Sequence, residues 1–103
     1  MQLPTVEELR LQCRIDIDDE DPLLLGYLTA AKEKASNYLN RNLYESDVPD
    51  GDNEGLIITP IIKLALMLAV GFWYDTRELK KVPQGFYDLL SDYRISLMRI
   101  KQC

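Results

Sequence analysis

Histidine is absent from this sequence of 103 residues, and it has only two cysteines and one tryptophan. Without histidine, the chain lacks the commonest general base and the commonest zinc ligand of proteins. The two cysteines, Cys13 and Cys103, do not form a paired or metal-binding spacing. Because the sequence opens without a signal-peptide pattern, we expect both to be free thiols in a reducing compartment.

Motifs for nucleotide binding and nucleophilic catalysis are also missing. The patterns G-x-x-x-x-G-K, G-x-G-x-x-G and G-x-S-x-G do not occur. Carboxylates are plentiful, but they lie in polar runs where nothing would raise their pKa. Residues 50–55 match the start of an EF-hand calcium loop, yet Ile61 stands where the bidentate glutamate is required, beside Pro60. The sequence therefore predicts no enzyme, no metal site and no cofactor.

The longest apolar stretch is too short to indicate a membrane span. Twelve of the fifteen residues from 60 to 74 are apolar, and Lys63 interrupts them. A spanning helix needs about 20 apolar residues, and a charge inside it is costly. A nucleic-acid stacking surface would need bases interleaved with the aromatic residues, and none follows them before Arg77. We therefore expect Phe72 and Trp73 to belong to a protein core.

The composition is that of a globular protein, with 47% apolar and 28% charged residues. At this length we expect one domain over residues 1–103, with a small core that partner subunits can extend. The net charge of −5 is unevenly placed: residues 1–54 hold thirteen acids and five bases, whereas residues 55–103 hold four acids and seven bases. The acidic total disfavours nucleic-acid binding, and the asymmetry permits head-to-tail packing of like subunits.

Two helices are predicted in the first 40 residues. Thr5 and Glu8 form a capping box that begins a short helix ending near residue 14. Asp21 and Pro22 have the form of an N-cap followed by a first-turn proline, so a second helix begins there and reaches about residue 40. Helical spacing places its buried face at Leu24, Leu28, Ala31, Ala35 and Tyr38. The five acids of residues 16–21 are expected to form a solvated turn.

Two more helices are predicted after residue 58. A threonine and a proline at residues 59–60 begin the third, which extends to about Glu78. It is apolar on most sides and should lie centrally or also meet a neighbouring subunit. Its least apolar stripe consists of Lys63, Met67, Gly71 and Asp75. A shorter fourth helix carries Phe86, Leu89, Leu90 and Tyr93. Residues 95–103 fit both helix and strand and stay unassigned.

Residues 41–58 are predicted to be a long acidic loop. They contain two glycines, one proline and five acids between residues 45 and 54, with no base after Arg41. Loops longer than about 12–15 residues are uncommon in compact domains and are often functional or disordered. Leu43, Tyr44 and residues 56–58 are expected to anchor the loop on a surface or to add an extended segment to a neighbour. The predicted fold is all-α, a small bundle of about four helices with this loop between the second and the third.

Three segments carry a resemblance to a known family: PLLLGYLTAAKEKASNYLNR at residues 22–41, PIIKLALMLAVGFWYDTRE at 60–78 and VPQGFYDLLSDYR at 82–94. In order and spacing they resemble the head-tail connector, or DNA-packaging, family of tailed bacteriophages. The residues that carry the likeness, beyond apolar spacing, are Gly71, Trp73, Tyr74, Arg77, Leu89, Leu90, Tyr93 and Arg94. Thr76 departs from the pattern, since many members have asparagine there.

The resemblance implies a structural adaptor for virion assembly, without enzymatic activity. Such proteins form a homo-oligomeric ring beneath the capsid portal, line the exit channel for DNA without sequence-specific binding, and dock tail or head-completion proteins. The expected location is the head-tail junction of the virion or the host bacterial cytoplasm, including a prophage-encoded origin, without membrane contact. The candidate subunit-contact residues are Tyr44, Tyr74, Asp75, Arg77, Glu78 and Arg94. The candidate channel-lining acids of the loop are Asp47, Asp50, Asp52 and Glu54.

Two other functions stay open. One is a small helical binding or regulatory module unrelated to phages, which would remain monomeric and bind another kind of partner. The other is a small membrane-associated protein that uses residues 56–74, which would partition into detergent. An enzyme ranks last because no residue pattern supports one.

Overall fold

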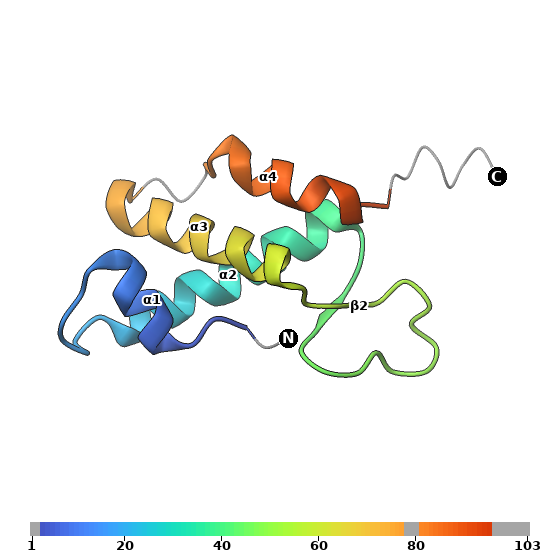
Figure 1. The fold of residues 1–103 in the computed structure, drawn as a ribbon, viewed down its shortest axis with the longest axis horizontal. Coiled ribbons are helices and arrows are strands. Elements are labelled where there is room, and N and C mark those ends of the chain that lie inside the picture. The colour runs from blue at the N-terminus through green and yellow to red at the C-terminus, as the bar shows by residue number, and fades with distance from the viewer. Residues whose placement is uncertain (1–2, 78–80, 96–103) are drawn as a thin grey trace.

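A computed structural model describes residues 3–77 and 81–95 and shows a mostly helical molecule (Figure 1). Its described helices are α1 (Val6–Cys13), α2 (Asp21–Leu39), α3 (Pro60–Thr76) and α4 (Gln84–Leu90), followed by one 3-10 turn, η1 (Ser91–Tyr93). Two short strands, β1 (Leu43–Tyr44) and β2 (Leu56–Ile57), lie between α2 and α3. α3 packs against each of the other three helices, with α1 and α4 on either side of it in Figure 1 and α2 behind.

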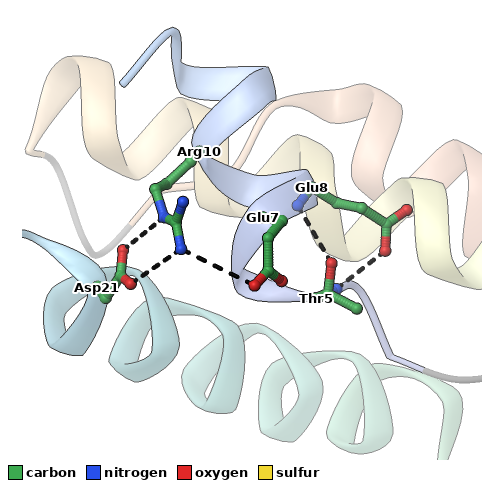
Figure 2. Close-up of polar contacts among 5 residues, drawn as sticks. All are labelled: Thr5, Glu7, Glu8, Arg10 and Asp21. Atoms are coloured by element: carbon green, nitrogen blue, oxygen red, sulfur yellow. Dashed lines mark hydrogen bonds and ion pairs between the residues drawn. The ribbon is translucent and has the colours of Figure 1, made fainter. Parts of the chain in front are cut away.

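The predicted N-caps of α1 and α3 are confirmed. The Thr5 hydroxyl accepts the backbone N–H of Glu8 at 3.2 Å, and the Glu8 carboxylate accepts the N–H of Thr5 at 3.0 Å (Figure 2). At α3, the Thr59 hydroxyl accepts the N–H of Ile62 at 3.2 Å, and a proline follows in the first turn. A capping side chain of this kind is worth about 1 kcal/mol. Both helix starts are therefore set by local sequence.

The start of α2 differs from the prediction by one residue. Asp21 is the first helical residue, and the N-cap is Glu20, whose side chain makes no capping bond. The Asp21 carboxylate instead accepts two hydrogen bonds from Arg10 of α1, from Nε at 2.9 Å and from Nη2 at 3.2 Å (Figure 2). A charged two-point contact is stronger than a bond to a neutral N–H, so it prevails over the cap. This ion pair fixes α1 against the first turn of α2.

The core lies where α1, α2 and α4 meet the inner face of α3. Its largest fully buried side chains are Leu9, Leu24, Leu39, Ile58, Ile62, Leu66, Val70, Phe86 and Leu90. No polar or charged side chain is buried among the described residues. Trp73 is 3% exposed and belongs to the core as predicted, whereas Phe72 is half-buried and packs against it. On α2, Leu39 is fully buried and Tyr38, assigned to the buried face from the sequence, is half-buried.

The least apolar stripe of α3 lies against α1. Lys63 Nζ is 2.9 Å from the Glu8 carboxylate, and Gln12 Nε2 donates to the Met67 carbonyl at 2.6 Å. Gly71 allows this approach, because a Cβ there would lie 2.7 Å from Gln12 Nε2. The polar positions of the central helix therefore bind α1 within the same chain. No described helix is long and apolar enough to cross a membrane.

The prediction of an all-α fold is wrong in one detail, because β1 and β2 form a small parallel sheet. Leu43 pairs with Leu56, and Tyr44 pairs with Ile57. The N–H groups of Leu56 and Ile58 donate to the carbonyls of Asn42 and Tyr44, each at 2.9 Å. A parallel pair needs a long connection, which residues 45–55 provide. Leu43, Tyr44 and residues 56–57, expected to lie on a surface or to extend a neighbour, instead pair with each other within the chain. Strands of two residues are too short to show a periodicity in the sequence.

Candidate functional site

Arg41 joins the base of the acidic loop to the segment after α4. Its guanidinium donates to three backbone carbonyls: Nε to Glu54 at 2.6 Å, Nη2 to Gly55 at 3.4 Å and Nη1 to Tyr93 at 3.3 Å. Hydrogen bonds that involve a charged donor are worth more than neutral ones. Arg41 therefore closes the loop and holds the end of η1 at the same time. The sequence did not predict this role of Arg41, because its partners are backbone carbonyls, which every residue has.

The segment after η1 lies against the end of α2. Ile95 N–H donates to the Leu39 carbonyl at 2.9 Å, and Asn40 Nδ2 donates to the Ile95 carbonyl at 2.7 Å. These contacts join residues 38–41, the sequence YLNR, to residues 93–95. Residues 38–41 and 93–94 carry the family resemblance, and the structure shows that they form one unit. We call residues 38–41 together with 93–95 the clamp.

Arg94 and Tyr93 extend the clamp in two directions. Arg94 Nε donates to the Tyr38 carbonyl at 2.8 Å, and its guanidinium lies 4.8 Å from the centre of the Tyr38 ring. The Thr59 hydroxyl donates to the Tyr93 hydroxyl at 3.2 Å, which links the clamp to the N-cap of α3. Arg94, predicted as a subunit contact, is exposed but already stacks within its own chain. Its role toward a neighbour stays a prediction.

Two residues predicted for different roles in the loop contact each other. The Tyr44 hydroxyl donates to Asp52 Oδ2 at 2.5 Å, and Asn42 Nδ2 donates to the same oxygen at 3.2 Å. The Tyr44 bond, followed by the Asn42 bond, lowers the pKa of Asp52, and the same contact raises the pKa of Tyr44. Asp52 is thus a fixed anion inside the loop. The other three candidate acids, Asp47, Asp50 and Glu54, are exposed.

Substitution of Tyr44 by phenylalanine should raise the pKa of Asp52 toward its ordinary value of 3.8, because it removes the contact that lowers that pKa most. A lowered folded-state pKa gives stability above the unfolded-state value that is lost as the pH falls through the folded one. The variant should therefore lose less stability than the wild type on acidification below that value. Carboxyl titration by NMR tests this, and an unchanged Asp52 pKa would contradict it.

The candidate contact residues at the end of α3 contact the start of α2. The Tyr74 hydroxyl donates to the Glu20 carboxylate at 3.0 Å, which raises the pKa of Tyr74. Arg77 lies 3.7 Å from the other Glu20 oxygen, donates to the Tyr27 hydroxyl at 3.4 Å and stacks 5.0 Å from the centre of the Tyr74 ring. Asp75 is exposed. Glu78, the remaining candidate of this group, lies outside the described residues.

The two groups of candidate residues lie at opposite ends of α2. Glu20 precedes the helix and Arg41 follows it, and the 19 residues of α2 span about 28 Å. Figure 1 shows the same separation, with the end of α3 far from the acidic loop. In the described part of the chain no group of three or more metal-binding side chains gathers, and Cys13 is a free thiol.

Comparison with known proteins gives one match that spans most of the chain. A family model described as phage gp6-like head-tail connector protein matches residues 4–94. This range contains every described helix and both halves of the clamp up to Arg94. No curated protein and no solved structure matches the chain.

Proposed function

Because the chain belongs to the phage gp6-like head-tail connector family and is therefore a structural phage protein of the head-tail junction, we propose that its copies form a ring between portal and tail. The family match over residues 4–94 is the observation that carries this proposal. The molecule is thin, with a shortest extent of 18 Å, and it exposes aliphatic side chains on α2 and α3. Contact with like subunits would bury such surface.

The acidic loop fits a position at the DNA channel of the proposed ring. The β1–β2 pair and Arg41 close its base, so residues 45–53 project from the helices as one closed loop (Figure 1). The exposed carboxylates of Asp47, Asp50 and Glu54 are available to line a channel. An acidic lining repels the phosphate backbone and so avoids the contacts that would trap passing DNA.

Charge reversal of the exposed loop acids should slow DNA ejection. A variant with Asp47, Asp50 and Glu54 changed to lysine would offer three phosphate contacts, and each contact strengthens DNA binding in a salt-dependent way. We expect slower ejection from the assembled particle at low salt and recovery as salt rises, measured by release of a DNA-bound dye. Asp52 is left unchanged because it is bonded inside the loop.

The matched control makes the same charge change elsewhere. Asp16, Asp18 and Asp19 are exposed acids of the turn between α1 and α2, and their replacement by lysine should leave ejection unaffected. Equal ejection rates for the wild type, the loop variant and the control would contradict the proposed position of the loop at the channel.

The adaptor function is tested by removing the protein from the phage or prophage that encodes it. An adaptor that joins head to tail is required for their union, so heads and tails should accumulate separately in its absence. Supply of the wild-type chain in trans should restore joined particles, counted by electron microscopy. Joined, infectious particles formed without the protein would contradict the proposal.

A further inference from the structure

An apolar stripe runs along the side of α3 that faces away from α2. Ile61 is 44% and Leu64 is 55% exposed, and the half-buried Leu68 and Phe72 continue the same helix face. We call these four residues the α3 stripe. A groove of about 310 Å³, bordered by residues of α1 and by Pro83, opens over its second half. The stripe is thus exposed at Ile61 and Leu64 and reached through this groove at Leu68 and Phe72.

A second apolar surface lies on α2. Gly26, Tyr27, Ala30 and Trp73 line a shallow pocket of about 210 Å³ with almost entirely apolar walls. Leu23, one helical turn before Tyr27, is 36% exposed at its border. A Cβ at Gly26 would have no other atom within 4 Å, so the helix is open to its surroundings there. We call these lining residues the α2 pocket.

We propose that the α3 stripe of one copy packs into the α2 pocket of the next, and that this head-to-tail contact builds the ring proposed above, on which the inference rests. Trp73 of the α2 pocket lies on the face of α3 that packs against Tyr27 of α2, about 100° around the helix from Phe72 of the α3 stripe, so the two surfaces open on different sides of α3. A two-fold dimer through either surface would leave the other exposed. A head-to-tail contact covers both on each copy of a closed ring.

The borders of the two surfaces carry opposite charge. Asp75 lines the groove at the end of the α3 stripe, and Asp88 is exposed on α4, which borders the stripe. Beside the α2 pocket lie two bases, Lys34, one helical turn after Ala30, and Arg77, which donates to the Tyr27 hydroxyl at 3.4 Å. The acid Glu33 also lies on the outer side of α2. Opposite charges around apolar centres favour stripe-to-pocket contact over stripe-to-stripe contact.

Two contacts of ordinary size per copy are compatible with the size of this molecule. A stable contact removes about 800 Å² from each partner. A copy that makes two contacts of this size would bury about a quarter of its accessible area of 6680 Å². That share is compatible with a molecule whose long and middle extents are 50 and 27 Å.

The test blocks each surface separately. Gly26→Arg fills the entrance of the α2 pocket from a position with free space, and Leu64→Glu places a charge in the exposed α3 stripe. Each variant alone should fail to assemble when concentrated or mixed with portal, as measured by sedimentation velocity. An equimolar mixture should give a one-to-one dimer, because one intact stripe meets one intact pocket and the blocked surfaces prevent growth.

Control variants separate assembly from folding. Thr29→Arg adds the same charge on an exposed position of α2 outside the pocket, and Gly26→Ala adds only a methyl group. Both should assemble as the wild type does, and all variants should keep the wild-type circular dichroism spectrum. Normal rings from Gly26→Arg or Leu64→Glu, or a mixture without dimer, would overturn the proposed contact while the adaptor function stands. Absence of any wild-type assembly, with or without portal, would overturn the ring and the contact together.

Discussion

Replacement of Trp73 by alanine should lower the free energy of unfolding by about 3–5 kcal/mol, because removal of a buried aromatic side chain leaves a large cavity in the core. The side chain is 3% exposed, its indole N–H donates to the Lys81 carbonyl at 2.6 Å, and its ring lies 6.1 Å from that of Tyr27. A small domain has only about 5–15 kcal/mol of stability in total. Chemical unfolding followed by circular dichroism measures the loss.

A conservative variant separates packing from the hydrogen bond. Trp73→Phe keeps an aromatic ring in the core and removes the donor to Lys81, so it should cost clearly less than the alanine substitution. The remaining cost is that of one lost hydrogen bond, about 0.5–1.5 kcal/mol, together with a partly filled cavity. A Trp73→Ala variant within about 1 kcal/mol of the wild type would show that this side chain does not hold the core.

Replacement of Arg41 by alanine should lower the free energy of unfolding by about 1.5–3 kcal/mol, because three carbonyls lose a charged donor together. The carbonyls belong to the base of the acidic loop and to the clamp. We therefore expect faster amide hydrogen exchange at Ile95 and at Ile58, whose N–H groups bond to α2 and to β1. Exchange measured by NMR reports both places in one experiment.

Two controls make the Arg41 result specific. Arg41→Lys keeps the charge, but a lysine ammonium lacks the fork of donors with which the guanidinium reaches three carbonyls. This variant should therefore restore only part of the protection against amide exchange. Lys32→Ala removes a base from the middle of α2 and should leave exchange at Ile95 and Ile58 unchanged. If Arg41→Ala raised the amide exchange rate at Ile58 but not at Ile95, Arg41 would not join the two segments.

The parts of the fold that follow from local sequence were predictable. Thr5 and Thr59 cap helices through partners only three residues away, and the burial of Trp73 follows from its place in the apolar stretch. The start of α2 was misplaced because the partner of Asp21 is Arg10 on another helix, eleven residues away. Propensity at a helix start is weaker than a charged contact that the folded chain supplies.

The clamp and the loop closure could not be predicted in this way. Asn40 and Ile95 are separated by 55 residues, and their contact uses a backbone carbonyl that every residue possesses. The loop acids looked equivalent in the sequence, yet the structure bonds Asp52 to Tyr44 and leaves Asp47 exposed. Long-range contacts between side chains and the backbone do not produce a characteristic spacing or residue pattern in the sequence. The family resemblance identified the motifs at residues 38–41 and 93–94, and the structure shows that these two motifs contact each other.

Electron microscopy of the purified portal of the encoding phage, with and without this protein, tests the proposed adaptor ring most directly. We predict a closed ring of copies seated coaxially on the portal, with the acidic loops toward the axis and successive copies joined from α3 stripe to α2 pocket. Portal particles that remain unchanged at every protein concentration, beside a chain that stays monomeric, would contradict it.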